Sequence, residues 1–87
     1  MKVIKVKAVK RQEKTVYIDT PFIKLDSFLK LADIASTGGY AKILITDGMI
    51  SVNGEICEMR GKKLRAGDRV EYESVVYKIE NKQTDEI

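Results

Sequence analysis

The residues in this sequence that are best suited to chemistry are lysines and arginines, and the chemistry that they suit is the binding of anions. Residues 60–69 contain five of them against one acid, a local charge of +4, and residues 1–14 contain six against one acid, a local charge of +5. The net charge of the whole chain is only +3. Two basic segments on an otherwise balanced chain indicate a polyanionic partner, with a merely solubilising surface as the alternative.

A second candidate anion site is the segment Thr37-Gly38-Gly39, which leads into a predicted helix. Glycines at a helix start leave backbone N–H groups unshielded at the positive end of the helix dipole, which suits a phosphate group. The alternative is a tight turn that needs small residues so that two helices can meet, and the two interpretations are compatible. The segment lacks the Gly-Lys-Ser/Thr ending of a phosphate-binding loop. Lys42 is predicted one turn further on, opposite the apolar face of the helix.

Catalysis and metal binding are disfavoured by the residue types. The chain has no histidine, the commonest general base and metal ligand, and the spacing of its acids suggests no carboxylate pair. The single cysteine, Cys57, excludes an intramolecular disulfide, and its neighbour Glu58 does not favour a reactive thiolate. We therefore expect no enzyme activity, cofactor, metal or small-molecule substrate. No apolar run approaches the roughly 18 residues of a membrane span and no signal peptide is evident, so we expect a cytoplasmic protein without a membrane partner.

The first of two predicted helices covers residues 26–35. Asp26 is suited to its start, as a cap or as an acid in the first turn. Four apolar residues recur at helical spacing and should form its buried face. They are Leu25, Phe28, Leu29 and Ala32.

The second predicted helix covers residues 39–47. Ser36 and Thr37 can end the first helix and cap this one. Gly48 suits the left-handed position that follows a helix C-terminus. The residues expected to face inward are Tyr40, Ala41, Leu44 and Ile45.

Alternating patterns predict strands before the helices. Residues 3–8 and 15–20 both alternate, and a polar turn is predicted over residues 10–14. The two strands would then pair as a hairpin. Pro21, the only proline, ends the second strand and marks the entry to the helical part.

A hairpin is predicted after the helices, because Asn53-Gly54 is the favoured pair for a two-residue turn in which both residues need positive φ. A basic loop over residues 59–65 follows. A turn at Gly67-Asp68 then leads to two further strands, over residues 69–73 and 75–79.

Several segments, in this order and at this spacing, resemble a known family. They resemble the RNA-binding domain named after small-subunit ribosomal protein S-four, also called the alpha-L motif, over about residues 16–73. Within it, the Gly-Gly-x-Ala-Lys turn and the Arg-Gly-Lys-Lys-Leu loop resemble the stand-alone bacterial YaaA/YbcJ-type branch. The segments are residues 24–30, 37–42, 48–54, and Lys63-Leu64 with Gly67-Asp68.

The resemblance implies an α+β fold in which two short helices pack on a small antiparallel sheet, with an added N-terminal strand or hairpin. We expect a basic N-terminal extension over residues 1–14, an alpha-L RNA-binding domain over residues 15–80, and a loose tail over residues 81–87.

The resemblance also implies a non-enzymatic protein that binds structured RNA, with ribosomal RNA, a ribosomal subunit or an assembly intermediate as the expected partner. Many members of the broader family carry an arginine where Gly38 stands. The expected contacts therefore shift to Lys42 and to the loop from Arg60 to Arg65. The expected RNA-binding residues are Lys24, Lys30, Thr37, Gly38, Gly39, Lys42, Arg60, Lys62, Lys63 and Arg65.

Three other functions are considered. A protein-interaction module in a ribosome-associated complex and a tRNA-binding protein of translation quality control both stay open. A sulfur carrier is suggested by Val52-Asn53-Gly54-Glu55. Such carriers react through a C-terminal Gly-Gly, whereas this sequence ends in Asp85-Glu86-Ile87.

Overall fold

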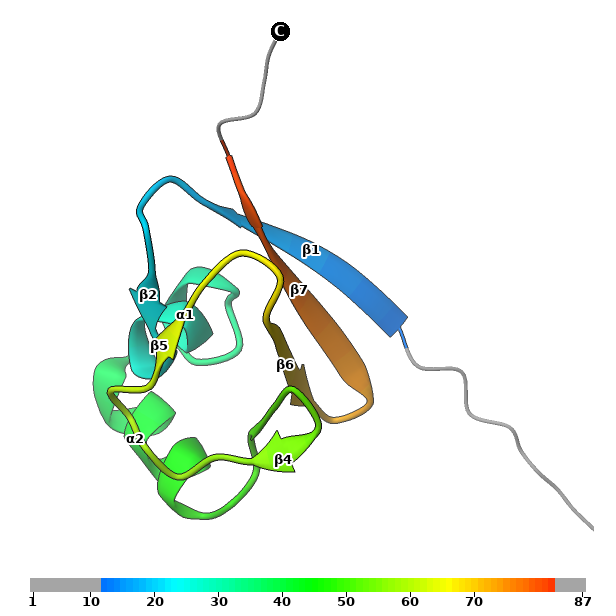
Figure 1. The fold of residues 1–87 in the computed structure, drawn as a ribbon. Helices are drawn as coiled ribbons and strands as arrows, with labels where there is room; N and C mark the ends of the chain where they lie inside the picture. Colours follow the sequence, from blue (N-terminus) through cyan, green and yellow to red (C-terminus); the bar gives the residue numbers. More distant parts are fainter. Residues whose placement is uncertain (1–11, 83–87) are drawn as a thin grey trace, which may run out of the picture.

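The computed structural model describes residues 12–82, in which two helices cover one face of a five-stranded sheet (Figure 1). The strand order in this sheet is β1-β7-β6-β3-β4, and β2 pairs with β5 in a separate two-stranded sheet. The elements, in chain order, are β1 (Gln12–Ile18), β2 (Ile23–Lys24), α1 (Leu25–Leu31), α2 (Gly38–Thr46), β3 (Ser51–Val52), β4 (Glu55–Ile56), β5 (Lys63–Leu64), β6 (Arg69–Tyr72) and β7 (Val75–Asn81).

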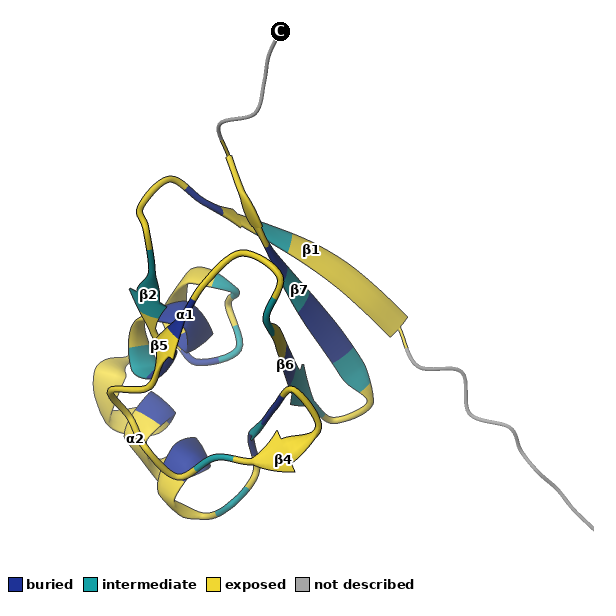
Figure 2. Ribbon diagram, viewed as in Figure 1, coloured by how far each residue is buried: buried dark blue, intermediate teal, exposed yellow. Residues whose placement is uncertain are grey.

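The core lies between the helices and the inner face of the sheet (Figure 2). Alternate residues of a strand point to the same face, so Tyr77 and Ile79 of β7 both face the helices. The fully buried ring of Phe28 from α1 meets the Tyr77 ring edge-on, with centroids 6.5 Å apart and planes at 82°. Aromatic pairs favour this geometry, which fixes α1 against β7.

The sheet is mixed, whereas the sequence predicted an antiparallel one. β1 runs parallel to β7, from Gln12 opposite Val75 to Ile18 opposite Asn81. The other pairs in this sheet, β6–β7, β3–β6 and β3–β4, are antiparallel. Parallel strands need a long crossover, and here the whole helical part of the domain separates the two strands in sequence.

The predicted turn over residues 10–14 is wrong for residues 12–14, which belong to β1. The extended conformation is favoured there because β7 offers an edge to pair with and because the Lys14 ammonium lies 6.0 Å from the centroid of the buried Tyr77 ring. The strand predicted over residues 3–8, and so its hairpin, lies outside the described residues. At the other end β7 includes Asn81, the first residue of the predicted tail, and residues 83–87 are not described.

Helix α1 has the predicted buried face but is shorter than predicted. Leu25, Phe28 and Leu29 are fully buried, and Ala32 packs against the core from the end of the helix. The helix stops at Leu31, because the chain turns through Asp33, which has φ 64°. Asp26 does not cap the helix: it lies in the first turn, and its carboxylate accepts the Ser27 N–H at 2.7 Å.

Helix α2 is capped as predicted. Thr37 Oγ accepts the Tyr40 N–H at 3.0 Å, and Gly48 follows the helix with φ 76°. The inward prediction is confirmed for Ala41, Leu44 and Ile45 and is wrong for Tyr40, which is 44% exposed. Tyr40 lies at the edge of the buried face, where its phenol meets the phenol of Tyr72 at the end of β6.

The predicted turns at Asn53-Gly54 and Gly67-Asp68 are confirmed. Asn53 and Gly54 have φ 52° and 90°, and Gly67 has φ 97°. Asn53 joins the hairpin to the second turn, because its amide donates to Asp68 Oδ1 at 3.2 Å and its Oδ1 accepts the Arg69 N–H at 3.0 Å. Strands β6 and β7 pair as an antiparallel hairpin, close to the predicted ranges.

Alkaline pH should destabilise the fold through Tyr77. Burial, and to a smaller extent the carboxylate of Glu73, raises the pKa of the Tyr77 phenol above its ordinary value of 10.0. The folded state therefore holds the phenolic proton more tightly than the unfolded chain, so this contribution to stability is complete below pH 10 and is lost as pH rises through the folded-state pKa. Urea unfolding at pH 8 to 11 should show this loss, and Tyr77→Phe should reduce it. An equally steep loss in Tyr77→Phe would contradict the assignment.

Candidate nucleic-acid interface

The basic loop is attached by its backbone to the start of α1. The N–H groups of Leu25 and Asp26 donate to the carbonyls of Lys62, at 2.8 Å, and Arg60, at 3.2 Å. No side chain caps this helix, so the loop carbonyls satisfy the first N–H groups that every helix leaves without an internal partner. The loop is therefore fixed, while Arg60 and Lys62 themselves are exposed. These α1 N–H groups are not available to an anion.

Strand β5 lies within the segment that the sequence predicted as a loop. Its two residues pair antiparallel with β2, so that Ile23 lies opposite Leu64 and Lys24 opposite Lys63. Leu64 is fully buried and anchors the pair, whereas both lysines are exposed. Like charges directly opposite each other in a sheet destabilise it, so the fold holds two cations together at an electrostatic cost.

Phe22 lies beside Lys63 and was not among the site residues predicted from the sequence. The Lys63 ammonium lies 4.8 Å from the centroid of the half-buried Phe22 ring, within cation–π range. The only sequence signal was an aromatic residue two positions before a lysine. Its relation to Lys63 follows from the β2–β5 pairing, which joins segments about 40 residues apart.

A second group of predicted residues surrounds the start of α2. The capping contact of Thr37 uses the Tyr40 N–H, and the N–H groups of Gly38 and Gly39 have no partner within the helix. The Lys30 ammonium, in the last turn of α1, lies 4.0 Å from the point where a Cβ of Gly38 would be. Lys42 is exposed one turn further along α2. This is the arrangement that a phosphate site requires: free N–H groups, a helix dipole and nearby ammonium groups.

The glycine pair is not explained by close packing. A Cβ added at Gly38 would meet only the flexible end of Lys30, and one at Gly39 would meet Thr37 Oγ at 4.0 Å, which are ordinary contact distances. Neither glycine has a left-handed φ. The alternative of a tight turn that needs small residues therefore has no support from the neighbouring atoms.

The ten predicted residues thus fall into two groups with one outlier. Lys24, Arg60, Lys62 and Lys63 surround the start of α1, and Lys30, Thr37, Gly38, Gly39 and Lys42 surround the start of α2. Arg65 lies beyond β5, where its N–H donates to Asp68 Oδ2 at 2.8 Å.

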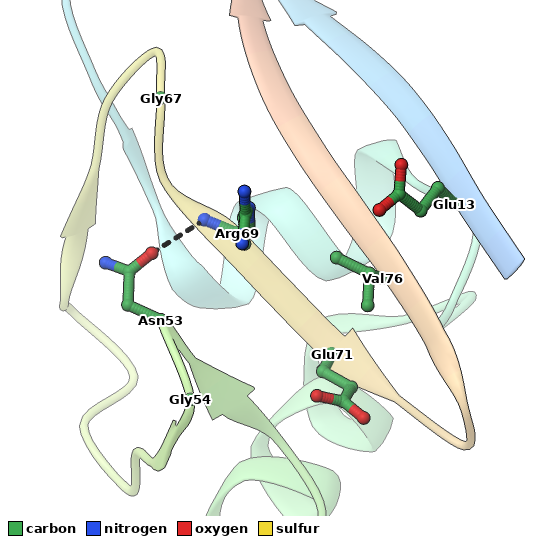
Figure 3. Close-up of a pocket in the computed structure, with 7 residues that line it drawn as sticks. All are labelled: Glu13, Asn53, Gly54, Gly67, Arg69, Glu71 and Val76. Carbon is green, nitrogen blue, oxygen red and sulfur yellow. Dashed lines mark hydrogen bonds between the residues drawn. The ribbon is translucent and has the colours of Figure 1, made fainter. Parts of the chain in front are cut away.

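The outer face of the five-stranded sheet has a different character. It carries a shallow pocket of about 400 Å³, in which Glu13 and Glu71 lie near Arg69 (Figure 3). The mixture of charges does not favour a polyanion.

Among residues 12–82, no three Cys, Asp or Glu side chains could together hold a metal ion. Over the same residues, no helix is both long and apolar enough to span a lipid bilayer.

Comparison with known proteins shows which family and which relative the chain resembles. The model of the S4 domain family matches residues 16–80, which include both groups of cations. The chain is also similar to the probable ribosome maturation protein RlbA of Bacillus subtilis (strain 168). The two are 47% identical over 58 residues, which make up 67% of this chain and 82% of that protein.

The glycine argument predicts that Gly38 tolerates a side chain. Gly38→Ala should leave the free energy of unfolding unchanged or raise it by up to about 1 kcal/mol, because alanine favours the helix and meets no fixed atom. Gly48→Ala is the matched control and should lower the free energy of unfolding by about 1–2 kcal/mol, because Gly48 has φ 76°, a left-handed conformation that alanine disfavours. Urea unfolding compares them. Equal destabilisation by both would mean that packing requires Gly38.

Proposed function

Because the chain belongs to the S4 domain family, we propose that it is a non-enzymatic protein that binds structured RNA through the two groups of cations at α1 and α2. The similarity to a probable ribosome maturation protein supports ribosomal RNA as the target, within ribosome maturation in the cytoplasm. The absence of histidine from the sequence supports a binding role over a catalytic one.

The observation that carries this proposal is the Lys24–Lys63 pair beside the helix-capping loop. The fold keeps these two exposed lysines opposite each other and holds Arg60 and Lys62 nearby through their backbone carbonyls. A phosphate backbone would relieve the repulsion, because each phosphate brings one negative charge to the surface. Contacts to phosphates position an RNA without reading its bases. Such contacts suit folded RNA, whose A-form helices hide base edges in a deep, narrow groove.

Transfer RNA in translation quality control is an alternative target with the same backbone chemistry. Competition separates the two: unlabelled ribosomal RNA should displace a bound ribosomal fragment at lower concentration than transfer RNA does. The reverse order would favour the alternative.

A second candidate function, that of a protein-interaction module, is supported by a different surface of the molecule. Met49, Ile56 and Met59 are 48%, 65% and 65% exposed, and Ile56 and Glu58 approach Gly48 at the end of α2. Ile56, Met59 and Glu58 also line a pocket of about 460 Å³. This role predicts that a partner protein stays bound to the chain after nuclease treatment.

Salt dependence tests the RNA site. With about four to six phosphate contacts, the logarithm of the binding constant should fall with the logarithm of salt concentration by about 0.7 to 0.9 per contact. Replacing Lys42, Lys62 and Lys63 by alanine should therefore reduce the slope by about 2 to 3. Filter binding of labelled bacterial ribosomal RNA at several salt concentrations measures it, with circular dichroism as the check on folding.

The control removes the same number of cations from the five-stranded sheet, by replacing Lys14, Arg69 and Lys78 with alanine. This variant has the same net charge but should keep the slope of the parent protein. Equal salt slopes for the two triple variants would show that net charge alone drives binding and would contradict the assignment of the RNA-binding residues.

A further inference from the structure

A pocket of about 500 Å³ lies next to the Lys24–Lys63 pair and shares Lys24 with the proposed phosphate contacts. The end of β1, the chain leading into β2, and α1 form its walls. Its volume is in the range of pockets that hold small organic groups. The lining residues on which its chemistry depends are Tyr17, Phe22, Lys24, Leu31 and Lys82.

The pocket presents large apolar side chains to solvent. Tyr17 is 58% exposed and Leu31 is 52% exposed, and both line the pocket. Phe22 also lines the pocket and is half-buried, and the Lys63 ammonium lies 4.8 Å from the centroid of its ring. Exposed aromatic and aliphatic groups that gather at one pocket suit a flat, apolar ligand.

Positive charge surrounds these apolar groups. Lys24 lines the pocket directly, and its sheet partner Lys63 lies over Phe22. Lys82 also lines the pocket, and its N–H donates to the Ile18 carbonyl at 2.7 Å. Asp19 is the carboxylate in the lining, so cations outnumber acids. A ligand with a flat apolar part and an attached anion fits these surroundings, and a nucleotide has both.

We propose that this pocket takes an unpaired nucleobase of the bound RNA, with Tyr17 as the stacking residue and Lys24 and Lys82 on the flanking phosphates. The inference rests on the proposed function and deepens it, because it names the class of RNA: a helix with an unpaired nucleotide next to it. Stacking on an aromatic ring tolerates any base, and lysine contacts to the backbone add affinity. Lys24 belongs to both sites, so one RNA can occupy them together.

Two RNA probes and three variants test this inference. The first probe is a blunt duplex hairpin, and the second is the same hairpin with one unpaired 2-aminopurine nucleotide at its 3′ end. Fluorescence of 2-aminopurine falls when the base stacks. The variants are Tyr17→Leu, Tyr17→Phe and Tyr40→Leu. The last is the matched control, because Tyr40 is also exposed but lies in α2 and does not line the pocket.

The parent protein should bind the extended hairpin more tightly than the blunt one and should quench 2-aminopurine. Tyr17→Leu should weaken binding of the extended hairpin by at least about fivefold, without changing its salt slope or the affinity for the blunt hairpin. Tyr17→Phe keeps the ring and should keep the affinity, and Tyr40→Leu should leave the preference for the extended hairpin unchanged.

Failure of this inference is distinguishable from failure of the proposed function. Equal binding of both probes with no effect of Tyr17→Leu would overturn the pocket while leaving the RNA-binding function in place. An equal loss for both probes in Tyr17→Leu would also overturn it. If the parent protein bound neither probe nor ribosomal RNA, the proposed function and this inference would both be wrong.

Discussion

The backbone contact between the basic loop and the start of α1 is the constraint on which the candidate interface depends. Helix α1 has seven residues, fewer than an isolated helix needs to be stable in water, and no side chain caps it. The carbonyls of Arg60 and Lys62 supply the missing cap. Helix and loop therefore form together: the loop completes the helix, and the helix fixes the backbone from which the cations project.

This constraint explains how like charges can be kept close. Lys24 directly precedes α1, and Lys63 directly follows the capping residues of the loop, so the hydrogen bonds that cap the helix also place the two lysines opposite each other. Buried Leu64 and the contact of Lys63 with the Phe22 ring offset part of the repulsion. The backbone that carries these cations is held without an anion, which would lower the entropic cost of the proposed binding.

Local patterns in the sequence predicted local structure well. The turn at Asn53-Gly54, the cap at Thr37 and the left-handed Gly48 each depend on a few neighbouring residues, and all are confirmed. The parallel β1–β7 pair and the two-residue β2–β5 pair depend on contacts between distant segments, which alternation alone cannot specify. Tyr40 was misplaced for a related reason: its side chain is 44% exposed and lies beside Tyr72 of the distant strand β6, a contact that helical spacing alone cannot predict.

The candidate site, too, was predicted from the sequence only in its residue types and not in its arrangement. The residue types predicted a basic surface, but not that one group of cations would be arranged around a helix start capped by loop carbonyls and the other around a helix start capped by Thr37. Helix α1 connects the two groups, with Lys24 before its first residue and Lys30 in its last turn, a rise of about 9 Å. The packing of Phe28 and Leu29 in the core holds that helix in place. In the proposed function, a fixed spacing between the two groups of cations would discriminate between RNAs by the positions of their phosphates. Selectivity would then follow from the shape of the folded RNA and not from its base sequence.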